Sequence, residues 1–503
     1  MRFQGIVTGR ANDCKNGGRE RDWARLSKRE NKVSDNSYVT RRKLLQSSAL
    51  FLPAVRLVRG QTTGNDVQKQ QDAILARIQA PVFPKRDFDV TRFGAKSDGK
   101  TDCTDAIRKA IEACTKAGGG RVVIPAGRFV TGAIHLDNNV NLYVGEGATL
   151  AFSQDPKKYL PVVYTRFEGT ECMNYSPFIY AWEKTNIGIT GPGTLDGQAD
   201  CGHWWNWVGR ASCGGGPGKP NANADKKMLV NGMGDKDVPV KERVFGEGHY
   251  LRPNFIQPYR STNFIIDGVT IKNSPMWEVN PVLCKNVIVR NLTIETDGPN
   301  NDGCDPESCS DVLIENCTFS TGDDCIAIKS GRNQDGRRVG KPCENIIVRN
   351  CNMKDGHGGV SIGSEVSGGI RNVFVDNCKM NSPHLQRALR IKTNSYRGGK
   401  IENINFQNNT VGEVAEAVIE VDYFYEEGEG GPFKPVVENI YVANVTSKKS
   451  KHGLYLHGYK DDPIRGLTVL NCEFNGAAQG NYLENVESVK LENVTVNGKS
   501  VKI

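Results

Sequence analysis

The chain has 503 residues, of which 38% are hydrophobic and 24% are charged, and 55 are glycine. This composition excludes a disordered protein, and the absence of a run of about 18 apolar residues excludes a predicted membrane-spanning helix. The net charge of +8 comes from residues 1–60, which carry 14 Lys and Arg against 5 Asp and Glu and leave 51 basic against 52 acidic residues elsewhere. Because a nucleic-acid-binding protein needs a sustained basic face, we expect no nucleic-acid partner.

Residues 1–60 predict an export leader. The segment Thr40–Gln46 reads TRRKLLQ and leads into a short apolar stretch that ends at the small residue Gly60. A charged start, an apolar centre and a small-residue exit are typical of export signals, and the pair Arg41-Arg42 indicates the twin-arginine route; the alternative is a basic surface helix. We expect a signal at 40–60, a linker at 61–84 and one folded domain at 85–503 that works in the periplasm or outside the cell.

The segment Thr104–Ala117 predicts a helix near the start of this domain. Its apolar residues recur at helical spacing, and three glycines at 118–120 end the pattern. These apolar residues are Ala106, Ile107, Ala110, Ile111 and Cys114. The repeats that follow need a covered end, and we expect this helix to plug the N-terminal one.

The segment Gly197–Tyr250 interrupts the repeats and is rich in glycine, proline and lysine, so we expect a long loop over one face. It contains three tryptophans, Trp204, Trp205 and Trp207. Two interpretations stay open for them. Their rings stack on sugars, or they anchor the loop to the apolar core.

A short pattern recurs along the domain and sets its architecture. Each copy reads Asn, alternating apolar residues, a second Asn or Gly, and an apolar-x-apolar pair, and from residue 263 the copies start 22 to 36 residues apart. Clear copies start at Asn186, Asn263, Asn286, Asp311, Asn345, Asn372, Asn403 and Asn439, and weaker ones at Gly466 and Ser488. Each copy offers two short strands that bury no face alone, which favours stacking into a parallel β-helix. The β-sandwich alternative needs regularly spaced hairpin turns, and that signal is weak.

The 15 cysteines do not predict a disulfide framework, although the leader implies export. Four of them follow Asn at equivalent repeat positions, so we expect a ladder of small buried side chains. These are Cys317, Cys351, Cys378 and Cys472. The pairs Cys103–Cys114, Cys201–Cys213 and Cys304–Cys309 remain possible bridges. No Cys or His spacing matches a zinc site, and we expect no metal and no cofactor.

Four polar motifs lie on consecutive repeats: NNDG at 300–303, GDD at 322–324, GHGG at 356–359 and RIK at 390–392. A solenoid places equivalent positions of neighbouring coils about 4.8 Å apart, so the motifs are predicted to form one patch. Asp302, Asp323 and Asp324 bring three carboxylates together, which is costly without a purpose. Arg390 and Lys392 share one face of a strand, with Ile391 pointing inward. Carboxylates beside two cations and His357 suit hydrolysis of an acidic glycoside.

These motifs, in this order, resemble those of the polygalacturonase family of glycoside hydrolases (family 28). The resemblance extends from about Phe88 to the C-terminus and includes GPGTLDGQ at 191–198. It implies a right-handed parallel β-helix, an inverting mechanism and a pectic polysaccharide or oligogalacturonide as substrate. Within NNDG, Asn301 stands where the family often has Thr.

The resemblance also implies roles for single residues. Asp323 matches the general acid, and Asp302 and Asp324 match the pair that activates water. His357 matches the histidine that tunes the acid. Arg390 and Lys392 match the residues that hold the substrate carboxylate, and further substrate contacts are expected from Asn300, Arg387 and Tyr396.

The length of two loops predicts the mode of attack. Gly197–Tyr250 precedes the coils that carry the motifs, and Tyr423–Pro435 follows them. Loops of this size beside the site are expected to close one end of a cleft and leave a pocket. A pocket fits a chain terminus, so we expect exo cleavage that releases galacturonate monomers or dimers from the non-reducing end.

Three alternatives remain. A rhamnogalacturonan or xylogalacturonan hydrolase of the same family differs only in substrate. A calcium-dependent pectate lyase shares the solenoid but abstracts a proton and needs a metal-bound carboxylate. A non-catalytic glycan-binding β-helix would bind the polymer without releasing reducing ends. The sequence leaves the oligomeric state open.

Overall fold

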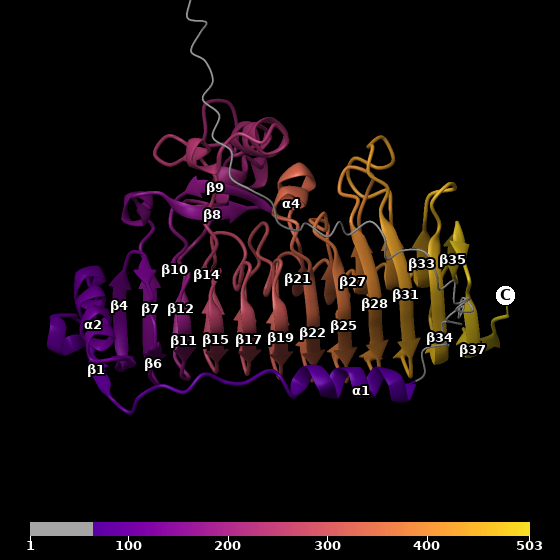
Figure 1. The fold of residues 1–503 in the computed structure, drawn as a ribbon, viewed down its shortest axis with the longest axis horizontal. Coiled ribbons are helices and arrows are strands. Elements are labelled where there is room, and N and C mark those ends of the chain that lie inside the picture. The colour runs from indigo at the N-terminus through magenta and orange to yellow at the C-terminus, as the bar shows by residue number, and fades with distance from the viewer. Residues whose placement is uncertain (1–63, 503) are drawn as a thin grey trace, which may run out of the picture. The chain divides into compact units, whose positions relative to one another are not determined.

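The structure, a computed structural model, describes residues 64–502; the predicted leader with its twin-arginine motif lies outside the described residues. From β1 onward the chain winds into the predicted right-handed parallel β-helix, whose strands lie on three faces that follow one another along the chain (Figure 1). No helix of the described part is long and apolar enough to span a membrane.

The first face carries the first strand of each repeat, and every strand pairs in parallel with the equivalent strand of the next coil. Its strands are β1 (Asp87–Asp89), β3 (Gly120–Ile124), β6 (Val140–Val144), β11 (Thr185–Thr190), β15 (Thr262–Asp267), β17 (Lys285–Arg290), β19 (Ser310–Glu315), β22 (Cys343–Arg349), β25 (Ile370–Asp376), β28 (Lys400–Gln407), β31 (Val436–Ala443), β34 (Ile464–Phe474) and β37 (Lys490–Val496).

The second face follows across a short bend, and it joins the first because β34 and β37 run through both. Its other strands are β2 (Asp98–Asp102), β4 (Gly127–Thr131), β7 (Ala148–Phe152), β12 (Thr194–Asp196), β16 (Thr270–Lys272), β18 (Thr293–Glu295), β20 (Thr318–Ser320), β23 (Asn352–Met353), β26 (Lys379–Met380), β29 (Thr410–Val411) and β32 (Thr446–Ser447). The short strands β36 (Val486–Glu487) and β38 (Lys499–Ser500) pair with β34 and β37.

The third face carries the predicted site. Its strands are β5 (Ile134–His135), β10 (Ile179–Trp182), β14 (Ile256–Tyr259), β21 (Ile326–Ile328), β24 (Val360–Ile362), β27 (Arg387–Lys392), β30 (Ala417–Asp422), β33 (His452–His457) and β35 (Tyr482–Glu484). Single parallel bridges at Val279 and Cys304 join β14 to β21, so the face is continuous along the coils.

Asparagine at the repeat positions has a conformational reason. The first and second Asn of a copy, such as Asn286 and Asn291, both have φ of +57°, a region that Asn tolerates better than most residues with a Cβ. The side chains then bond from coil to coil: Asn286 Nδ2 donates to Asn263 Oδ1 at 2.8 Å, and Asn372 Nδ2 donates to Asn345 Oδ1 at 3.0 Å. The repeated Asn therefore allows the chain to bend at each copy, and its side chain forms a ladder of hydrogen bonds between coils.

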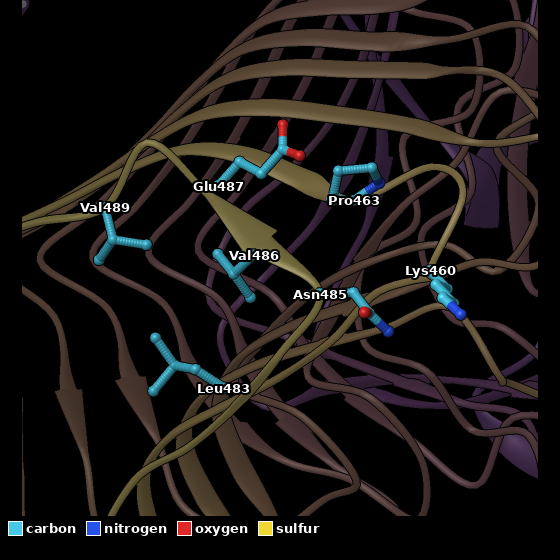
Figure 2. Close-up of a pocket in the computed structure, with 7 residues that line it drawn as sticks. All are labelled: Lys460, Pro463, Leu483, Asn485, Val486, Glu487 and Val489. Atoms are coloured by element: carbon cyan, nitrogen blue, oxygen red, sulfur yellow. The ribbon is translucent and has the colours of Figure 1, made fainter. Parts of the chain in front are cut away.

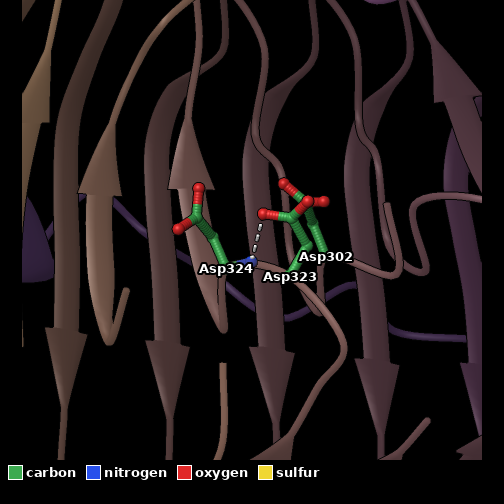
Figure 3. A group of neighbouring side chains, drawn as sticks. All are labelled: Asp302, Asp323 and Asp324. Carbon is green, nitrogen blue, oxygen red and sulfur yellow. Dashed lines mark hydrogen bonds between the residues drawn. The ribbon is translucent and has the colours of Figure 1, made fainter. Parts of the chain in front are cut away.

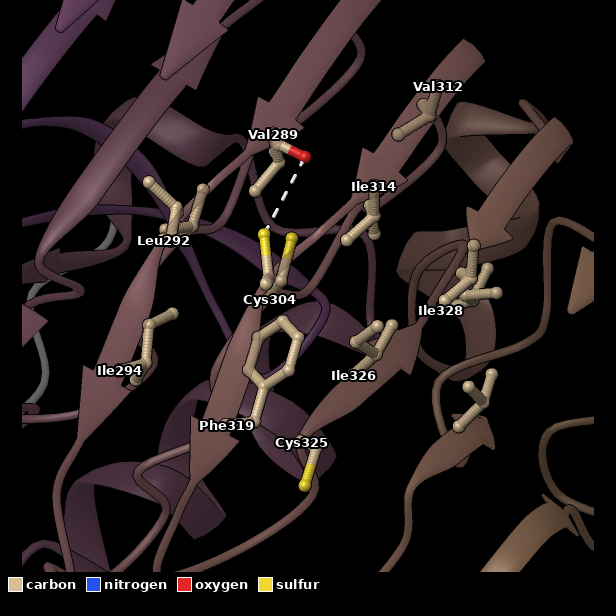
Figure 4. Packing of buried hydrophobic residues seen from close by; sticks show 14 of the residues in the cluster. Val289, Leu292, Ile294, Cys304, Val312, Ile314, Phe319, Cys325, Ile326 and Ile328 are labelled. Carbon is tan, nitrogen blue, oxygen red and sulfur yellow. Dashed lines mark hydrogen bonds between the residues drawn. The ribbon is translucent and has the colours of Figure 1, made fainter. Parts of the chain in front are cut away.

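The core lies inside the coils and is built from stacked Val, Ile, Leu and Phe side chains, with cysteine where space is small (Figure 4). The four repeat cysteines are buried and unbridged, as the ladder interpretation requires. Of the three possible bridges, Cys201–Cys213 is formed, whereas the cysteines of the other two pairs are free and buried.

Helix α2 (Thr104–Lys116) confirms the predicted end cap. Its five predicted apolar residues are all buried, and they join the same core cluster as the first coils. Asp102 Oδ1 accepts from the Thr104 backbone N–H at 2.9 Å, and the helix ends where Gly118 and Gly119 take positive φ.

Helix α1 (Gly64–Leu75) lies in the segment that the sequence analysis assigned to a linker. It runs along the outer side of the first face (Figure 1), where Val67, Ile74 and Ile78 pack on outward apolar residues from several coils. Arg77 Nη2 also donates to Asp311 Oδ1 at 2.7 Å. These three are the buried apolar residues of the described segment 64–84. They are too few to form a recognisable helical pattern among its polar residues, so the sequence did not predict this helix.

An insertion rises above the third face near β14. It combines the antiparallel hairpin β8 (Val163–Phe167) and β9 (Thr170–Asn174), strand β13 (Val244–Phe245) and the expected long loop. The short helices α3 (Asn223–Lys227), η3 (Trp205–Val208), η4 (Ala211–Cys213), η5 (Met228–Gly234) and η6 (Val240–Glu242) lie in that loop. Three further short helices lie elsewhere: α4 (Asn333–Val339), η1 (Val90–Phe93) and η2 (Pro156–Tyr159).

The tryptophans of the loop divide between the two interpretations. Trp204 and Trp207 are buried and pack on Tyr159 and Tyr175, so they anchor the loop. Trp205 is half-buried and donates from Nε1 to the Ser274 carbonyl at 2.8 Å.

The last coils end in a cavity of about 300 Å³ (Figure 2). Leu483, Val486 and Val489 form its apolar side, and Lys460, Asn485 and Glu487 bring polar groups. None of these residues belongs to the predicted site.

Candidate active site

The third face brings the four predicted motifs together on its outer side. Inward neighbours such as Cys304, Ile326 and Ile391 are fully buried in the core, which forces the alternate residues outward. One oxygen from each of Asp302, Asp323 and Asp324 lies within 4.8 Å of the other two. In Figure 3 the three carboxylates project to the same side of the sheet.

Asp323 is the most accessible of the three carboxylates, with 18% of its side chain exposed. Its Oδ1 accepts from the Asp324 backbone N–H at 3.0 Å and lies 2.9 Å from Nδ1 of His357. The bond to Asp323 raises the pKa of His357, although burial opposes the shift. Since Oδ1 already has these two partners, Oδ2 is the oxygen left to exchange a proton.

The glycines that flank His357 hold the two coils close together. Gly356 has φ of +143°, and a Cβ there would collide with the Asp323 carbonyl. A Cβ at Gly358 would lie 2.9 Å from Asp324 Oδ1 and collide with Ser361 Oγ. The motif therefore needs small residues on both sides to bring the imidazole to the carboxylates.

Asp324 is fully buried and paired with the predicted cations. Lys392 Nζ donates to its Oδ2 at 2.7 Å, and Arg390 Nη1 lies 3.9 Å from its Oδ1. Burial alone would raise the pKa of Asp324, but Lys392, Arg390 and Lys329 outweigh it and hold this pKa at about 2. Asp324 is therefore ionised throughout the ordinary pH range.

Asp302 behaves in the opposite way. Burial, with the nearby Asp305 and Asp323, raises its pKa well above the usual value. Asp305 is also buried, and its pKa rises to about 8. The structure thus places one ionised carboxyl, Asp324, beside a buried pair that retains a proton near neutral pH.

Lys329 is a site residue that the sequence analysis missed. Its buried Nζ lies 3.7 Å from Asp302 Oδ2, 3.6 Å from Asp305 Oδ2 and 3.3 Å from Glu365 Oε2, and 4.4 Å from the Trp277 ring centroid. These carboxylates raise its pKa despite its burial. Lys329 follows β21 directly, at the outward position level with Lys392, so the strand alternation that placed Arg390 and Lys392 would also have found it.

Asn300 and Asn301 shape the turn that presents Asp302. Asn300 has φ of +55° and accepts on Oδ1 from Arg252 Nη2 at 2.7 Å. Asn301 is fully buried, and its Nδ2 donates to the carbonyls of Ser274 and Met276, each at 3.0 Å. Asn301, which stands where the family often has Thr, therefore fixes this turn to the neighbouring coil.

Two further residues, Arg387 and Tyr396, were predicted to contact the substrate, and the structure places them differently. Arg387 lies on the same strand as Arg390, and its Nε donates to Glu420 at 2.5 Å. Tyr396 is 38% exposed on the loop after β27, and it is held there through its backbone, whose carbonyl accepts from Arg337 Nη1 at 3.1 Å. Tyr425 was missed: its ring centroid lies 5.3 Å from both Arg390 Cζ and Lys392 Nζ. Tyr425 lies on the predicted loop Tyr423–Pro435. The length of this loop did not indicate which of its residues would reach the two cations.

The three carboxylates also have the donor type that a divalent cation prefers. However, Asp324 already pairs with Lys392, and Lys329 lies beside Asp302. The side chains themselves therefore supply the positive charge at this site.

Two family profiles match the chain. Residues 229–497 match the profile "Glycosyl hydrolases family 28", and residues 88–205 match "Rhamnogalacturonase A/epimerase, pectate lyase-like". The first match contains every predicted site residue.

Known proteins resemble the chain over most of its length. An exopolygalacturonase structure from Thermotoga maritima is 46% identical, with a TM-score of 0.83 over 86% of this chain and 96% of that one. A polygalacturonase structure from Erwinia carotovora is 26% identical, with a TM-score of 0.61 over 82% and 98%. An exo-poly-alpha-D-galacturonosidase from Dickeya chrysanthemi is 28% identical over 82% of this chain and 75% of its own.

Proposed function

The chain belongs to glycosyl hydrolases family 28, and we propose that it hydrolyses the α-1,4-galacturonosidic bonds of polygalacturonate from the chain end. One observation carries this proposal: three carboxylates from neighbouring coils lie within 4.8 Å of one another, beside the cations Arg390 and Lys392. Similar proteins are named for exo-acting galacturonan cleavage.

The two kinds of carboxyl suit the two halves of the reaction. Asp323 is the general acid, because it is accessible and its Oδ2 is free to give a proton to the glycosidic oxygen. Asp324, held ionised by Lys392, takes a proton from the attacking water. Asp302, whose buried pair with Asp305 retains a proton near neutral pH, orients that water. His357 fixes the Asp323 carboxyl in place.

Water attack from the face opposite the leaving group inverts the anomeric carbon. Most inverting glycosidases separate their two carboxyls by about 6.5–9.5 Å, and the 4.8 Å here is shorter. We propose inversion because the water is shared by the Asp302–Asp324 pair, so no carboxylate needs to attack the sugar. Proton NMR of fresh product tests this: β-galacturonate appearing first supports inversion, and α-galacturonate appearing first contradicts it.

Arg390 and Lys392 hold the substrate carboxylate, with Tyr425 over both cations. Asn300, Arg387 and Tyr396 remain weaker candidates for substrate contacts. Arg387 contributes through Glu420, which it shares with Arg390.

The exo mode is supported by ion pairs that join both loops beside the site. Lys226 of the long loop pairs with Glu168 at 2.5 Å, and Glu168 pairs with Arg332 at 3.2 Å. Arg332 Nη2 in turn lies 3.3 Å from Glu426 of the second loop. A wall tied in this way closes one end of the cleft and leaves room for a chain terminus.

Viscosity of polygalacturonate followed against reducing ends tests the mode. Exo cleavage releases many reducing ends before viscosity falls, whereas a collapse after a few per cent cleavage means endo action. The same assay with a chelator tests the lyase alternative, because a calcium-dependent lyase would stop and would form unsaturated products that absorb ultraviolet light. Activity in chelator without such products supports the hydrolase.

We also propose that the enzyme is exported to the periplasm or beyond. The support is the sequence of residues 40–60 and the polymeric nature of the substrate. Fractionation of cells that express the full chain, compared with a variant in which Arg41-Arg42 is replaced by Lys-Lys, tests the route.

A further inference from the structure

The outer row of the third face continues past Arg390 into coils that the proposed mechanism does not use. Arg390 is paired in register with Glu420, Glu420 with Tyr455, and Tyr455 with Tyr482. Neighbouring coils are about 4.8 Å apart, so Tyr455 lies about 10 Å from Arg390 along the face.

A pocket of about 180 Å³ opens at this place. Arg387 and Glu420 form its near side, and Tyr455 and His452 form its far side. Glu420 accepts from Arg387 at 2.5 Å and from Arg390 at 3.3 Å, so one carboxylate joins the pocket to the candidate active site. The pocket is therefore an extension of the same face.

Tyr455 offers one ring face to this pocket. Tyr482 stacks on it at a centroid distance of 5.0 Å and an angle of 17°. Because Tyr482 follows Tyr455 in coil order, it covers the side away from Glu420 and leaves the other side toward the pocket. An aromatic ring backed in this way is a rigid surface for the C–H groups of a sugar ring.

The charges of the pocket select against a further carboxylate. Three acids line it, Glu416, Glu420 and Asp422, against the fixed cations Arg387 and Lys451. Both cations are already paired, Arg387 with Glu420 and Lys451 with Glu416 at 3.3 Å. A uronate carboxylate would face like charge, which is costly, whereas an uncharged ring would not.

We propose that this pocket binds a neutral pyranose unit of the substrate chain, a methyl-esterified galacturonate or a neutral sugar, stacked on Tyr455. This inference rests on the proposed function, because it takes the ring held by Arg390 and Lys392 as the charged unit at the cleaved bond. The enzyme would then require a free carboxylate beside the bond and prefer an uncharged unit farther along.

The test compares three tetramers. The first consists of four free galacturonates, the second carries a methyl ester on the unit farthest from the cleaved bond, and the third has galactose in place of that unit. We expect the wild type to have the higher kcat/KM on the two neutral-ended tetramers. Tyr455→Ala should lower kcat/KM on those two by roughly 3- to 10-fold, the worth of an aromatic contact. Digalacturonate, too short to reach the pocket, should be cleaved at the wild-type rate, and Tyr455→Phe should keep the preference.

The control is Tyr143→Ala, which removes a half-buried tyrosine from β6 on the first face, and it should change none of these ratios. A preference for the ester alone or for galactose alone identifies which neutral unit is bound. The inference is overturned if the wild type prefers the fully charged tetramer, or if Tyr455→Ala loses the same factor on dimer and tetramers. The wild-type comparison decides even if Tyr455→Ala does not fold. Failure of the wild type to cleave any of these substrates would instead refute the proposed function.

Discussion

Replacing Lys392 with methionine removes the charge that lies closest to a fully buried carboxylate. Lys392 Nζ donates to Asp324 Oδ2 at 2.7 Å, and 7% of the Lys392 side chain is exposed against none of Asp324. The pair also raises the pKa of Lys392 to about 12, so both partners favour the charged state. We therefore expect the substitution to lower stability and, if Lys392 holds the substrate carboxylate as proposed, substrate binding as well.

The size of the stability effect follows from the pKa of Asp324. A fall from the ordinary 3.8 to about 2 corresponds to about 2 kcal/mol of stabilisation. Because the folded pKa is lowered, this stabilisation is fully present above pH 3.8 and is lost as the pH falls toward 2. Without Lys392, burial is less well opposed, and an ion left in a broken buried pair costs about 3–5 kcal/mol.

Urea unfolding of Lys392→Met at several pH values measures this. The variant's pKa for Asp324 rises, so its loss of unfolding free energy should grow from about pH 4 to neutral pH. Lys449→Met is the matched control, since Lys449 pairs with Glu413 at 2.6 Å with 68% of its side chain exposed, and it should lose less than about 1 kcal/mol. A loss that is equal in both variants, or that does not change with pH, would refute the reasoning.

Further predictions concern the same face. Lys392→Met should lower kcat/KM on polygalacturonate roughly 10- to 100-fold, the worth of a charge-assisted bond; wild-type kinetics at low salt would place the carboxylate elsewhere. Asp323→Asn should lower kcat by roughly 10²- to 10⁴-fold with an unchanged circular dichroism spectrum, and near-normal turnover would exclude it as the acid. Protonated His357 stabilises the fold fully below its ordinary pKa of 6.5, and this stabilisation is lost as the pH rises through its raised folded pKa. The difference in free energy of unfolding between wild type and His357→Gln should therefore narrow from pH 6 to pH 9. Lys329→Met should lower the free energy of unfolding by about 3–5 kcal/mol; a wild-type melting temperature would show that its carboxylates do not need it.

The sequence was sufficient for the coils because each repeat carries its own bend. Asn286 and Asn291 mark two positive-φ positions, and between them Val287 and Val289 pack in the inner core while Ile288 packs in the outer cluster. Once the coils are stacked, residues one coil apart become neighbours. The grouping of Asp302 with Asp323 followed from this geometry alone.

Features that depend on contacts between distant segments were not predictable in the same way. Tyr425 reaches the cations because its loop folds back over β27, and no periodic signal describes a loop path. The hairpin β8–β9 lies between repeats, and its apolar residues Phe167 and Cys172 pack on the long loop and β13 instead of on an equivalent coil. The pKa of Asp324 depends on its burial and on its distance from Lys392, and the sequence alone gives neither quantity.

Helix α1 has a consequence for the order of folding. It precedes all the coils in the chain, but together with Ile78 it joins a cluster of outward residues that runs from Ile265 to Ala443. A 12-residue helix is marginal by itself in water, and its partners lie on an outer surface that exists only after several coils have stacked. The element that is synthesised before the coils is therefore among the last to gain protection from hydrogen exchange, and slow exchange of its amides reports that the stack behind it is complete.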